Sequence, residues 1–345
     1  MKYILYNSKE LQDGNGRMYY FDNLKFLLIF LVVLGHFLDP LTKNGSETAR
    51  VIWLFISLFH MPLFILISGI FAKKSIERND KSKIIIYLFL SIVLNFLSFA
   101  INKFIYKDNV SFNLLKVSGV PWYLFAMAVW YYISMKTKNI NKKVLIAFNI
   151  IIALIVGYDK NIGDYLMISR AIVFYPFFLL GTIVKKETIT DKLSNKTIRI
   201  VSIILFIMIF VIAYVYINNI YWIRPLTTAR NSYFSLKSLQ NYGFLIRLMW
   251  YGISTIMSIL FMMIVPRGKT LFSELGKRTL AVYFLHTLVL QVWYHYNYDL
   301  GVIEYILLSI IVTIILSLKI FDWPFKKILS LNFYESDNKK LREKE

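Results

Sequence analysis

The first long apolar segment of the chain contains ionisable side chains that could perform chemistry inside a membrane. Lys25 and His36 are eleven residues apart, which on a helix corresponds to a rise of roughly 16 Å. Asp39 follows His36 by three residues, so a helix would place its carboxylate beside the imidazole. Such a carboxylate fixes the tautomer of the ring and raises its basicity, which suits a general base.

Two more histidines lie in other apolar segments, and both permit a structural interpretation. His60 precedes Pro62 in the second segment, and His286 lies in the ninth. An imidazole within a membrane can assist catalysis, or it can simply hydrogen-bond a neighbouring helix. Both interpretations stay open for His60 and His286. Lys25 can likewise bind a substrate or extend to the lipid headgroups.

The composition predicts a polytopic membrane protein. Of the 345 residues, 57% are hydrophobic and only 17% are charged, less charge than soluble domains carry. The chain has no cysteine, which excludes disulfides and thiolate metal ligands. Its four histidines have unrelated spacings, so we expect no metal site and no bound cofactor. Residues 1–23 lack the pattern of a cleaved signal peptide, and the first helix is expected to serve as the targeting signal.

The hydropathy pattern predicts an all-α bundle of about ten transmembrane helices. We divide the chain into an N-terminal segment at 1–23, a membrane domain at 24–321 and a solvated tail at 322–345. The fourth, fifth and sixth apolar runs are short for a span. The ten runs are 24–41, 51–72, 84–105, 121–135, 144–157, 171–184, 198–220, 244–265, 280–297 and 302–321.

The basic residues alternate between the predicted loops and give an orientation. Five connecting or terminal segments carry four to six Lys or Arg each, and the alternate loops carry three or fewer. The positive-inside rule places both termini in the cytoplasm. The net charge of +20 then reflects topology, and we expect no nucleic-acid partner. The basic segments are 73–83, 136–143, 185–199, 266–279 and 322–345.

This orientation places the candidate side chains at different depths. Lys25 falls near the cytoplasmic surface, His36 and His60 in the outer half, and His286 in the inner half. Arg170 heads the sixth run at the outer surface and is either a boundary residue or a sugar contact. Trp122 and Tyr123, next to it in depth, and the aromatic outer loop 221–243 fit interfacial anchors or a sugar-binding surface.

Four ordered stretches over about residues 20 to 290 resemble the acyltransferase family 3 membrane proteins, and within them the fucose 4-O-acetylase-like branch. The first stretch has a basic residue, ten intervening residues and a histidine. The stretches are Asp22-Asn-Leu-Lys25 with Val32-Val-Leu-Gly-His36; Phe59-His-Met-Pro-Leu-Phe64 with Ile67-Ser-Gly69; Arg170 with Phe174-Tyr-Pro-Phe-Phe-Leu-Leu-Gly181; and Leu275-Gly-Lys-Arg-Thr-Leu280 with Tyr283, Leu285 and His286.

The resemblance implies an O-acyltransferase that moves acetyl from cytoplasmic acetyl-CoA to a hydroxyl of a cell-envelope or capsular polysaccharide. It implies a bacterial cell-membrane location and a glycan acceptor, with polysaccharide-assembly proteins as further partners. His36 matches the catalytic histidine of the family and Lys25 its basic partner. We expect catalytic roles for His36, Asp39 and His60, donor binding by Lys25 and Asp22, and substrate binding by Arg170, Trp122, Tyr123 and His286.

The chain departs from the family in one motif, and a second class of function stays open. Many members carry Arg-x-x-Arg after the second span, where this chain reads Lys73-Lys-Ser-Ile-Glu-Arg78. Some members also carry an outer hydrolase-like domain, which we expect this protein to lack. Ten spans with intramembrane ionisable groups also fit an exporter of glycans or lipid-linked sugars, although the Lys-x10-His pattern and the His-Met-Pro-Leu-Phe segment favour the enzyme. An exporter would move its substrate without chemical change.

Overall fold

A computed structural model describes residues 11–14, 16–107, 111–112, 119–161, 167–186, 189, 195–296 and 300–331. Over these residues the chain is helical and contains no β-strand, only an isolated bridge between Gln12 and Met18. The α-helices are α2 Tyr19–Lys43, α3 Glu47–Ser57, α4 His60–Glu77, α5 Ser82–Phe104, α6 Trp122–Lys136, α7 Lys142–Ile155, α8 Ile168–Ile183, α10 Lys196–Val215, α11 Ile217–Ile220, α12 Arg224–Thr227, α13 Gly243–Ile264, α14 Leu271–Leu275, α15 Thr279–His295, α16 Val302–Leu316 and α17 Lys319–Leu329. Short 3₁₀ turns are η1 Val156–Tyr158, η2 Tyr221–Ile223, η3 Tyr233–Tyr242 and η4 Gly276–Arg278.

Several helices have the length and composition of membrane spans. Within the described ranges, five helical stretches meet both criteria: α2, α3 with α4, α5, α10, and η3 with α13. The pair α16 and α17, bent by 57°, makes a sixth if it counts as one span. α10 presents Ile200, Ile204 and Ile207 outward, each about half exposed. Apolar surface of this extent is typical of a face that contacts lipid.

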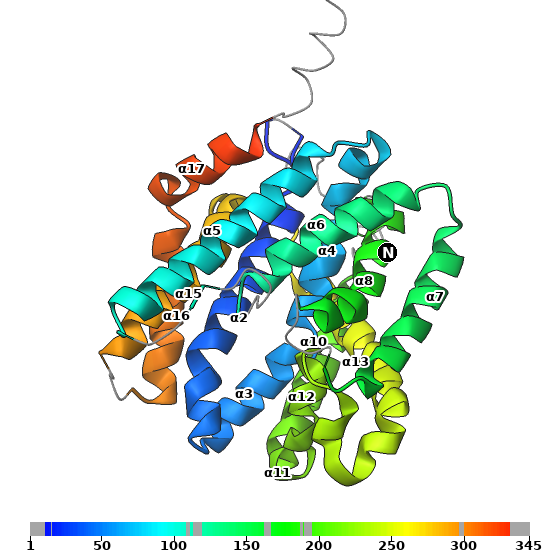
Figure 1. Cartoon of the computed structure of the whole chain (residues 1–345), viewed down its shortest axis with the longest axis vertical. Coiled ribbons are helices and arrows are strands. Elements are labelled where there is room, and N and C mark those ends of the chain that lie inside the picture. Colours follow the sequence, from blue (N-terminus) through cyan, green and yellow to red (C-terminus); the bar gives the residue numbers. More distant parts are fainter. Residues whose placement is uncertain are drawn as a thin grey trace, which may run out of the picture.

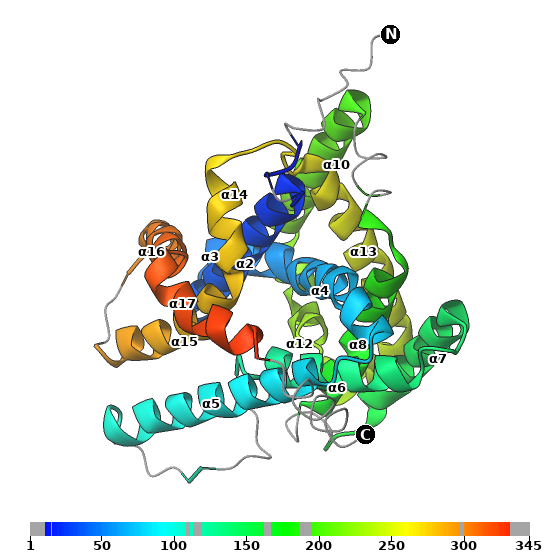
Figure 2. The same ribbon diagram turned by 90° about the horizontal axis from the view of Figure 1, so that it is seen from above.

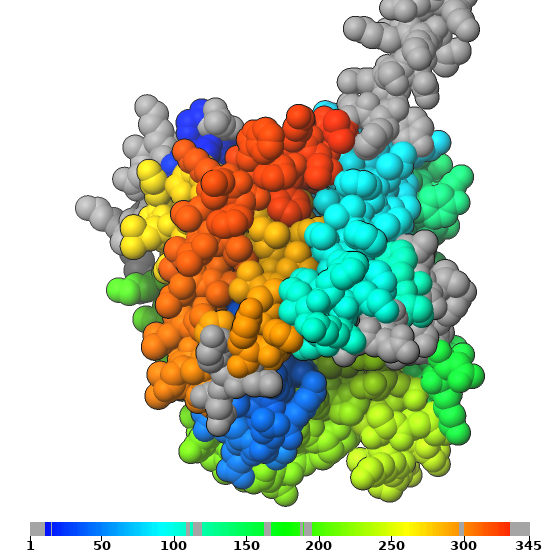
Figure 3. All heavy atoms as spheres, turned by 60° about the vertical axis from the view of Figure 1, so that its left-hand side comes forward, coloured from blue at the N-terminus to red at the C-terminus, as the bar shows by residue number. Residues whose placement is uncertain are grey.

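α2 lies at the centre of the bundle and positions the residues of the first apolar segment. α3, α4, α15 and α16 pack around it, while α7, α10 and α13 lie further out (Figures 1 and 2). α5 and α6 run side by side along one edge (Figure 2). On the face that Figure 3 turns forward, α15 and α17 lie beside α5, and α16 lies on the far side of α15. The Lys25–His36 segment is therefore surrounded by helices from distant parts of the chain.

α4 and α8 form the closest helix crossing, and two glycines permit it. A Cβ atom at Gly69 would lie 3.1 Å from the Cα of Gly181 and closer still to the Phe178 carbonyl oxygen. A Cβ at Gly181 would meet the Leu66 carbonyl in the same way. The missing side chains let the two backbones touch, as small residues do at membrane helix interfaces.

The second predicted span contains a break just before His60. α3 ends at Ser57 and α4 starts at His60, so the break lies at Leu58 and Phe59. Pro62 has no N–H to donate to the Leu58 carbonyl, and its ring would clash with that carbonyl in a continuous helix. The effect of the proline therefore falls four residues upstream, directly before His60.

The ends of two other predicted segments also differ from the structure. α2 continues through Pro40 to Lys43. Pro40 has no N–H to donate to the His36 carbonyl, and the Tyr294 hydroxyl donates to that carbonyl at 3.3 Å. The last span stops at Leu316, and α17 continues to Leu329 instead of a solvated tail beginning at 322. α17 packs against the bundle, since Phe325 is buried and the Lys83 ammonium donates to the Leu329 carbonyl at 3.0 Å. Residues 332–345 lie outside the described part.

Candidate active site

His36 and His286 face each other between α2 and α15. The centroids of the two imidazole rings are 5.4 Å apart. His286 is fully buried, whereas His36 keeps part of its surface accessible. Their predicted placement in opposite halves of the membrane is corrected by this contact. α15 reaches the level of His36 because the turn before it, at Gly276, packs directly on the backbone of Asp22 in α2.

Backbone carbonyls fix the orientation of two histidines. Nδ1 of His286 lies 2.9 Å from the Val282 carbonyl oxygen, and Nδ1 of His60 lies 2.7 Å from the Ile56 carbonyl oxygen. A carbonyl can only accept, so each neutral ring carries its proton on Nδ1 and a lone pair on Nε2. Nε2 of His286 is buried without a hydrogen-bond partner. This nitrogen is available to accept a proton or a hydrogen bond.

His60 belongs to the same region. The Ile56 carbonyl accepts from its imidazole and also from the Phe59 backbone N–H at 3.2 Å, in the break before α4. His36 lies within electrostatic range of both His60 and Arg170. His60, Phe64 and Ser68 follow each other at four-residue intervals and all keep partial exposure. The i, i+4 spacing places the three side chains on one face of α4, and Phe64 and Ser68 of that face contact Tyr123.

Aromatic residues of α6 and an arginine of α8 form another wall of the site. The Arg170 guanidinium lies 5.1 Å from the Trp122 ring centroid, and its Nε donates to the Thr228 carbonyl. The Tyr123 hydroxyl is 2.6 Å from the Ser68 hydroxyl, and its ring is 5.1 Å from the ring of Tyr283. The predicted substrate-binding residues Arg170, Trp122 and Tyr123 thus share one region with the histidines.

Asp39 does not form the predicted pair with His36 in the described structure. One carboxylate oxygen accepts from the Arg224 guanidinium at 2.5 Å and the other from Lys43 at 2.7 Å. Arg224 also stacks over Trp53, 4.7 Å from its ring centroid. The reason is competition, since two permanent cations attract the carboxylate more strongly than a neutral imidazole does. Asp39 thereby ties the end of α2 to α12.

Asp22 and Lys25 form an ion pair at the start of α2. The Lys25 ammonium lies 2.8 Å from the buried Asp22 carboxylate, which also accepts two hydrogen bonds from Arg17 at 2.6 Å. These hydrogen bonds raise the pKa of Arg17, which precedes the helix, above its ordinary value. Lys25 and Lys186 both lie over the ring of Phe71. Cations therefore gather at this end, about eleven helical residues below His36.

Some residues of this region were not predicted from the sequence. Ser68 lies two turns after His60, a spacing that could have revealed it. Tyr294 donates to the backbone carbonyls of His36 and Phe37, at 3.3 and 3.1 Å. Its position shows no local signal, because it depends on how α15 crosses α2.

Among the described residues, histidines of three helices, an arginine and several aromatic side chains thus lie together inside an apolar helix bundle. Residues 18–321 match the family described as acyltransferase domain. Because the match covers most of the chain, the protein belongs to this acyltransferase family.

Two curated relatives carry the name nodulation protein NolL. The relative from Sinorhizobium fredii (strain NBRC 101917 / NGR234) is 28% identical over 211 residues, which is 56% of this chain and 55% of the relative. The relative from Mesorhizobium japonicum (strain LMG 29417 / CECT 9101 / MAFF 303099) is 26% identical over 185 residues, 48% of each chain. The chain thus spans about half the length of the curated relatives it matches. No solved structure matches.

Proposed function

We propose that this protein is an integral-membrane O-acetyltransferase that uses acetyl-CoA and modifies a hydroxyl of a cell-envelope or capsular polysaccharide. The observation that carries the proposal is the His36–His286 pair, because the second ring presents an unprotonated, unpartnered Nε2 to the site. Membership of the acyltransferase family favours this function over glycan export. We further propose that the protein lies in the bacterial cytoplasmic membrane, with ten spans and both termini in the cytoplasm.

The transfer needs a base and a positioned thioester. His36 removes the proton from the acceptor hydroxyl while the oxygen attacks the thioester carbonyl carbon. The carbon–sulfur bond breaks, and the coenzyme A thiolate takes up the proton from the imidazolium. An O-acetyl ester and free coenzyme A result. Nε2 of His286 accepts a hydrogen bond from the protonated His36 ring. Removing the His286 side chain should therefore lose part of the 10²–10⁴-fold rate increase that general base catalysis typically contributes.

The remaining residues have positioning roles in this proposal. Lys25 and Asp22, at the predicted cytoplasmic end of α2, hold the anionic donor from that side. His60, Arg170, Trp122 and Tyr123 hold the acceptor sugar, since aromatic rings and a guanidinium suit its apolar faces and hydroxyls. His60 offers a second lone pair toward the same region. Asp39 acts indirectly, by fixing the outer end of α2.

The test measures O-acetyl groups on the surface polysaccharide by proton NMR in a deletion strain. The strain is complemented with wild type, His36→Ala or His286→Ala, and with His295→Ala as a matched control outside the site. We expect wild type and His295→Ala to restore the acetyl signal and the two site variants to lose most of it. Full acetylation by His36→Ala at normal protein levels refutes the mechanism. Unchanged acetylation with less surface polysaccharide indicates export.

A separate experiment tests the topology. The chain has no cysteine, so single cysteines can be placed at Lys74 and Lys143 for the predicted inside, and at Lys160 and Asn231 for the outside. A membrane-impermeant thiol reagent on whole cells should label the last two positions only. Labelling of Lys74→Cys on intact cells contradicts the orientation.

A further inference from the structure

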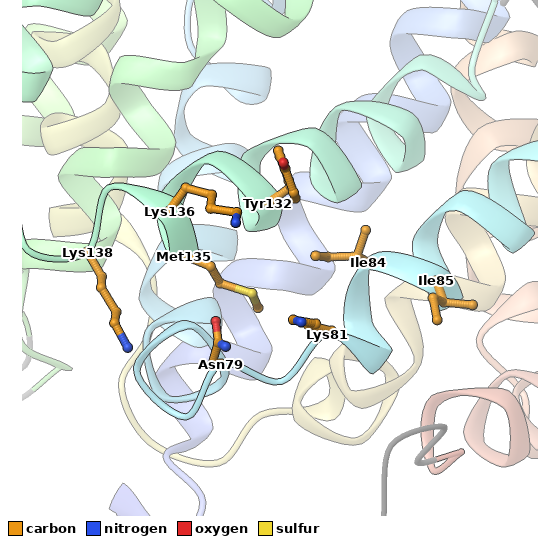
Figure 4. Close-up of a pocket in the computed structure, with 8 residues that line it drawn as sticks. All are labelled: Asn79, Lys81, Ile84, Ile85, Tyr132, Met135, Lys136 and Lys138. Atoms are coloured by element: carbon orange, nitrogen blue, oxygen red, sulfur yellow. The ribbon is translucent and has the colours of Figure 1, made fainter. Parts of the chain in front are cut away.

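A cleft of about 490 Å³ opens between the ends of α5 and α6, at the end of the bundle predicted to be cytoplasmic. Three lysines from two segments line it: Lys81 at the start of α5, Lys136 at the end of α6 and Lys138 just after it. Lys81 and Lys136 extend toward the same space, and Lys138 lies at its edge (Figure 4). The cleft is far from the histidines, because Lys136 is fourteen residues along α6 from Trp122.

The walls of the cleft are apolar where they meet the outer surface of the bundle. Ile85 of α5 and Tyr132 of α6 line it and are 37% and 54% exposed. Ile85 begins a stripe along α5 that continues through Phe89, Ile92 and Phe96, each about half exposed. These positions share one face of the helix. The cleft therefore combines a cluster of lysines with an exposed apolar stripe, which extends from it along the predicted membrane-facing side of α5.

The neighbouring helix α17 indicates that the cleft lies at headgroup depth. α17 bends by 57° from α16 and packs its end against the start of α5 through Lys83. Trp323, Lys326 and Lys327 are on its exposed side. Tryptophan and lysine in this arrangement are typical of a helix lying in the membrane interface. In Figure 1, α17 and the start of α5 occupy the same end of the molecule.

We propose that this cleft binds an anionic phospholipid, with its phosphate between Lys81 and Lys136 and an acyl chain along the α5 stripe. The lysines complement the negative charge of the headgroup. The exposed apolar side chains that continue from the cleft along α5 favour contact with the acyl chain of the lipid. Asp80, the nearest acid in sequence, accepts a hydrogen bond from the N–H of Ser82 at 3.1 Å. The described residues that line the cleft include three lysines and no acid. The proposal depends on the helices lying in a membrane, and it does not depend on acyl transfer.

The experiment is native mass spectrometry of the purified full chain titrated with phosphatidylglycerol or phosphatidylcholine. The test variant is Lys81→Gln/Lys136→Gln/Lys138→Gln. The control replaces three other exposed lysines outside the cleft with glutamine, namely Lys74, Lys143 and Lys196. Each lysine near an anionic headgroup contributes enough that losing three should weaken phosphatidylglycerol binding at least about tenfold. The control triple should bind as wild type does, and thermal unfolding without lipid verifies that all three proteins are folded.

Further arms separate a lipid from other phosphates. Glycerophosphoglycerol, inorganic phosphate and coenzyme A are titrated in the same way. We expect phosphatidylglycerol to bind more tightly than its headgroup alone, because the α5 stripe contributes through the acyl chain. Equal retention of phosphatidylglycerol by the two triple variants overturns the proposal. So does equal binding of phosphatidylcholine, or coenzyme A binding that only the cleft variant loses. None of these results bears on whether the histidines catalyse acyl transfer.

Discussion

The α4–α8 crossing gives the sharpest prediction about stability. In Gly69→Ala, the new Cβ would lie 3.0 Å from the Phe178 carbonyl carbon and 3.1 Å from the Gly181 Cα. The limiting contact is with the Phe178 carbonyl oxygen, which the new Cβ would overlap, so the helices must separate by roughly 1 Å. The obstacles are backbone atoms, which cannot rotate away. Overpacking costs about 1–3 kcal/mol, and the rigid neighbours place this substitution at the upper end.

Thermal unfolding of the purified protein in detergent measures the effect. For a chain of 345 residues, we expect Gly69→Ala to lower Tm by about 4 °C. Gly252→Ala is the matched control, because nothing lies within 4 Å of a Cβ at that position of α13. Alanine there should be neutral or stabilise by up to about 1 kcal/mol. Gly69→Ala/Gly181→Ala should cost less than the sum of the single changes, since one separation relieves both clashes. Equal Tm values for Gly69→Ala and Gly252→Ala would refute the reasoning.

Three further predictions concern polar contacts. A double-mutant cycle with Asp39→Asn and Arg224→Gln should give a coupling of about 1 kcal/mol in thermal unfolding, because the pair is only about a quarter exposed; additive changes contradict the ion pair. Tyr123→Phe and Ser68→Ala should lower acetylation by similar factors, and each should cost about 1 kcal/mol of stability. The double variant should lose little more acetylation than either single variant. Multiplied losses in the double variant would show that the two hydroxyls act independently. Asp22→Asn leaves two cations facing each other, so its Tm deficit should shrink from low salt to about 0.5 M salt; a deficit insensitive to salt argues against repulsion as the cause.

Much of the helical framework follows from hydropathy, because a chain in lipid must satisfy its backbone hydrogen bonds internally. Each predicted apolar run contains or overlaps a helix, and the fourth to sixth runs are short as expected. Hydropathy could not place the break at Leu58, because that break depends on where the ring of Pro62 meets the preceding turn. It also could not predict the bend at Ser317, where the buried Arg278 donates to the Ser317 carbonyl at 3.0 Å.

The same distinction between local sequence and tertiary structure applies to the candidate active site. The sequence by itself determined which side chains are available: Lys25 and His36 at a fixed helical separation, His60 beside a proline, and His286 in a later apolar run. Helical geometry sets distances within one segment, and it therefore fixes these local relations. It could not determine that Asp39 turns from His36 to Arg224, since that cation comes from a segment 185 residues away. The tertiary structure alone decided that His36 and His286 meet, because the level of α15 depends on a glycine packing against α2.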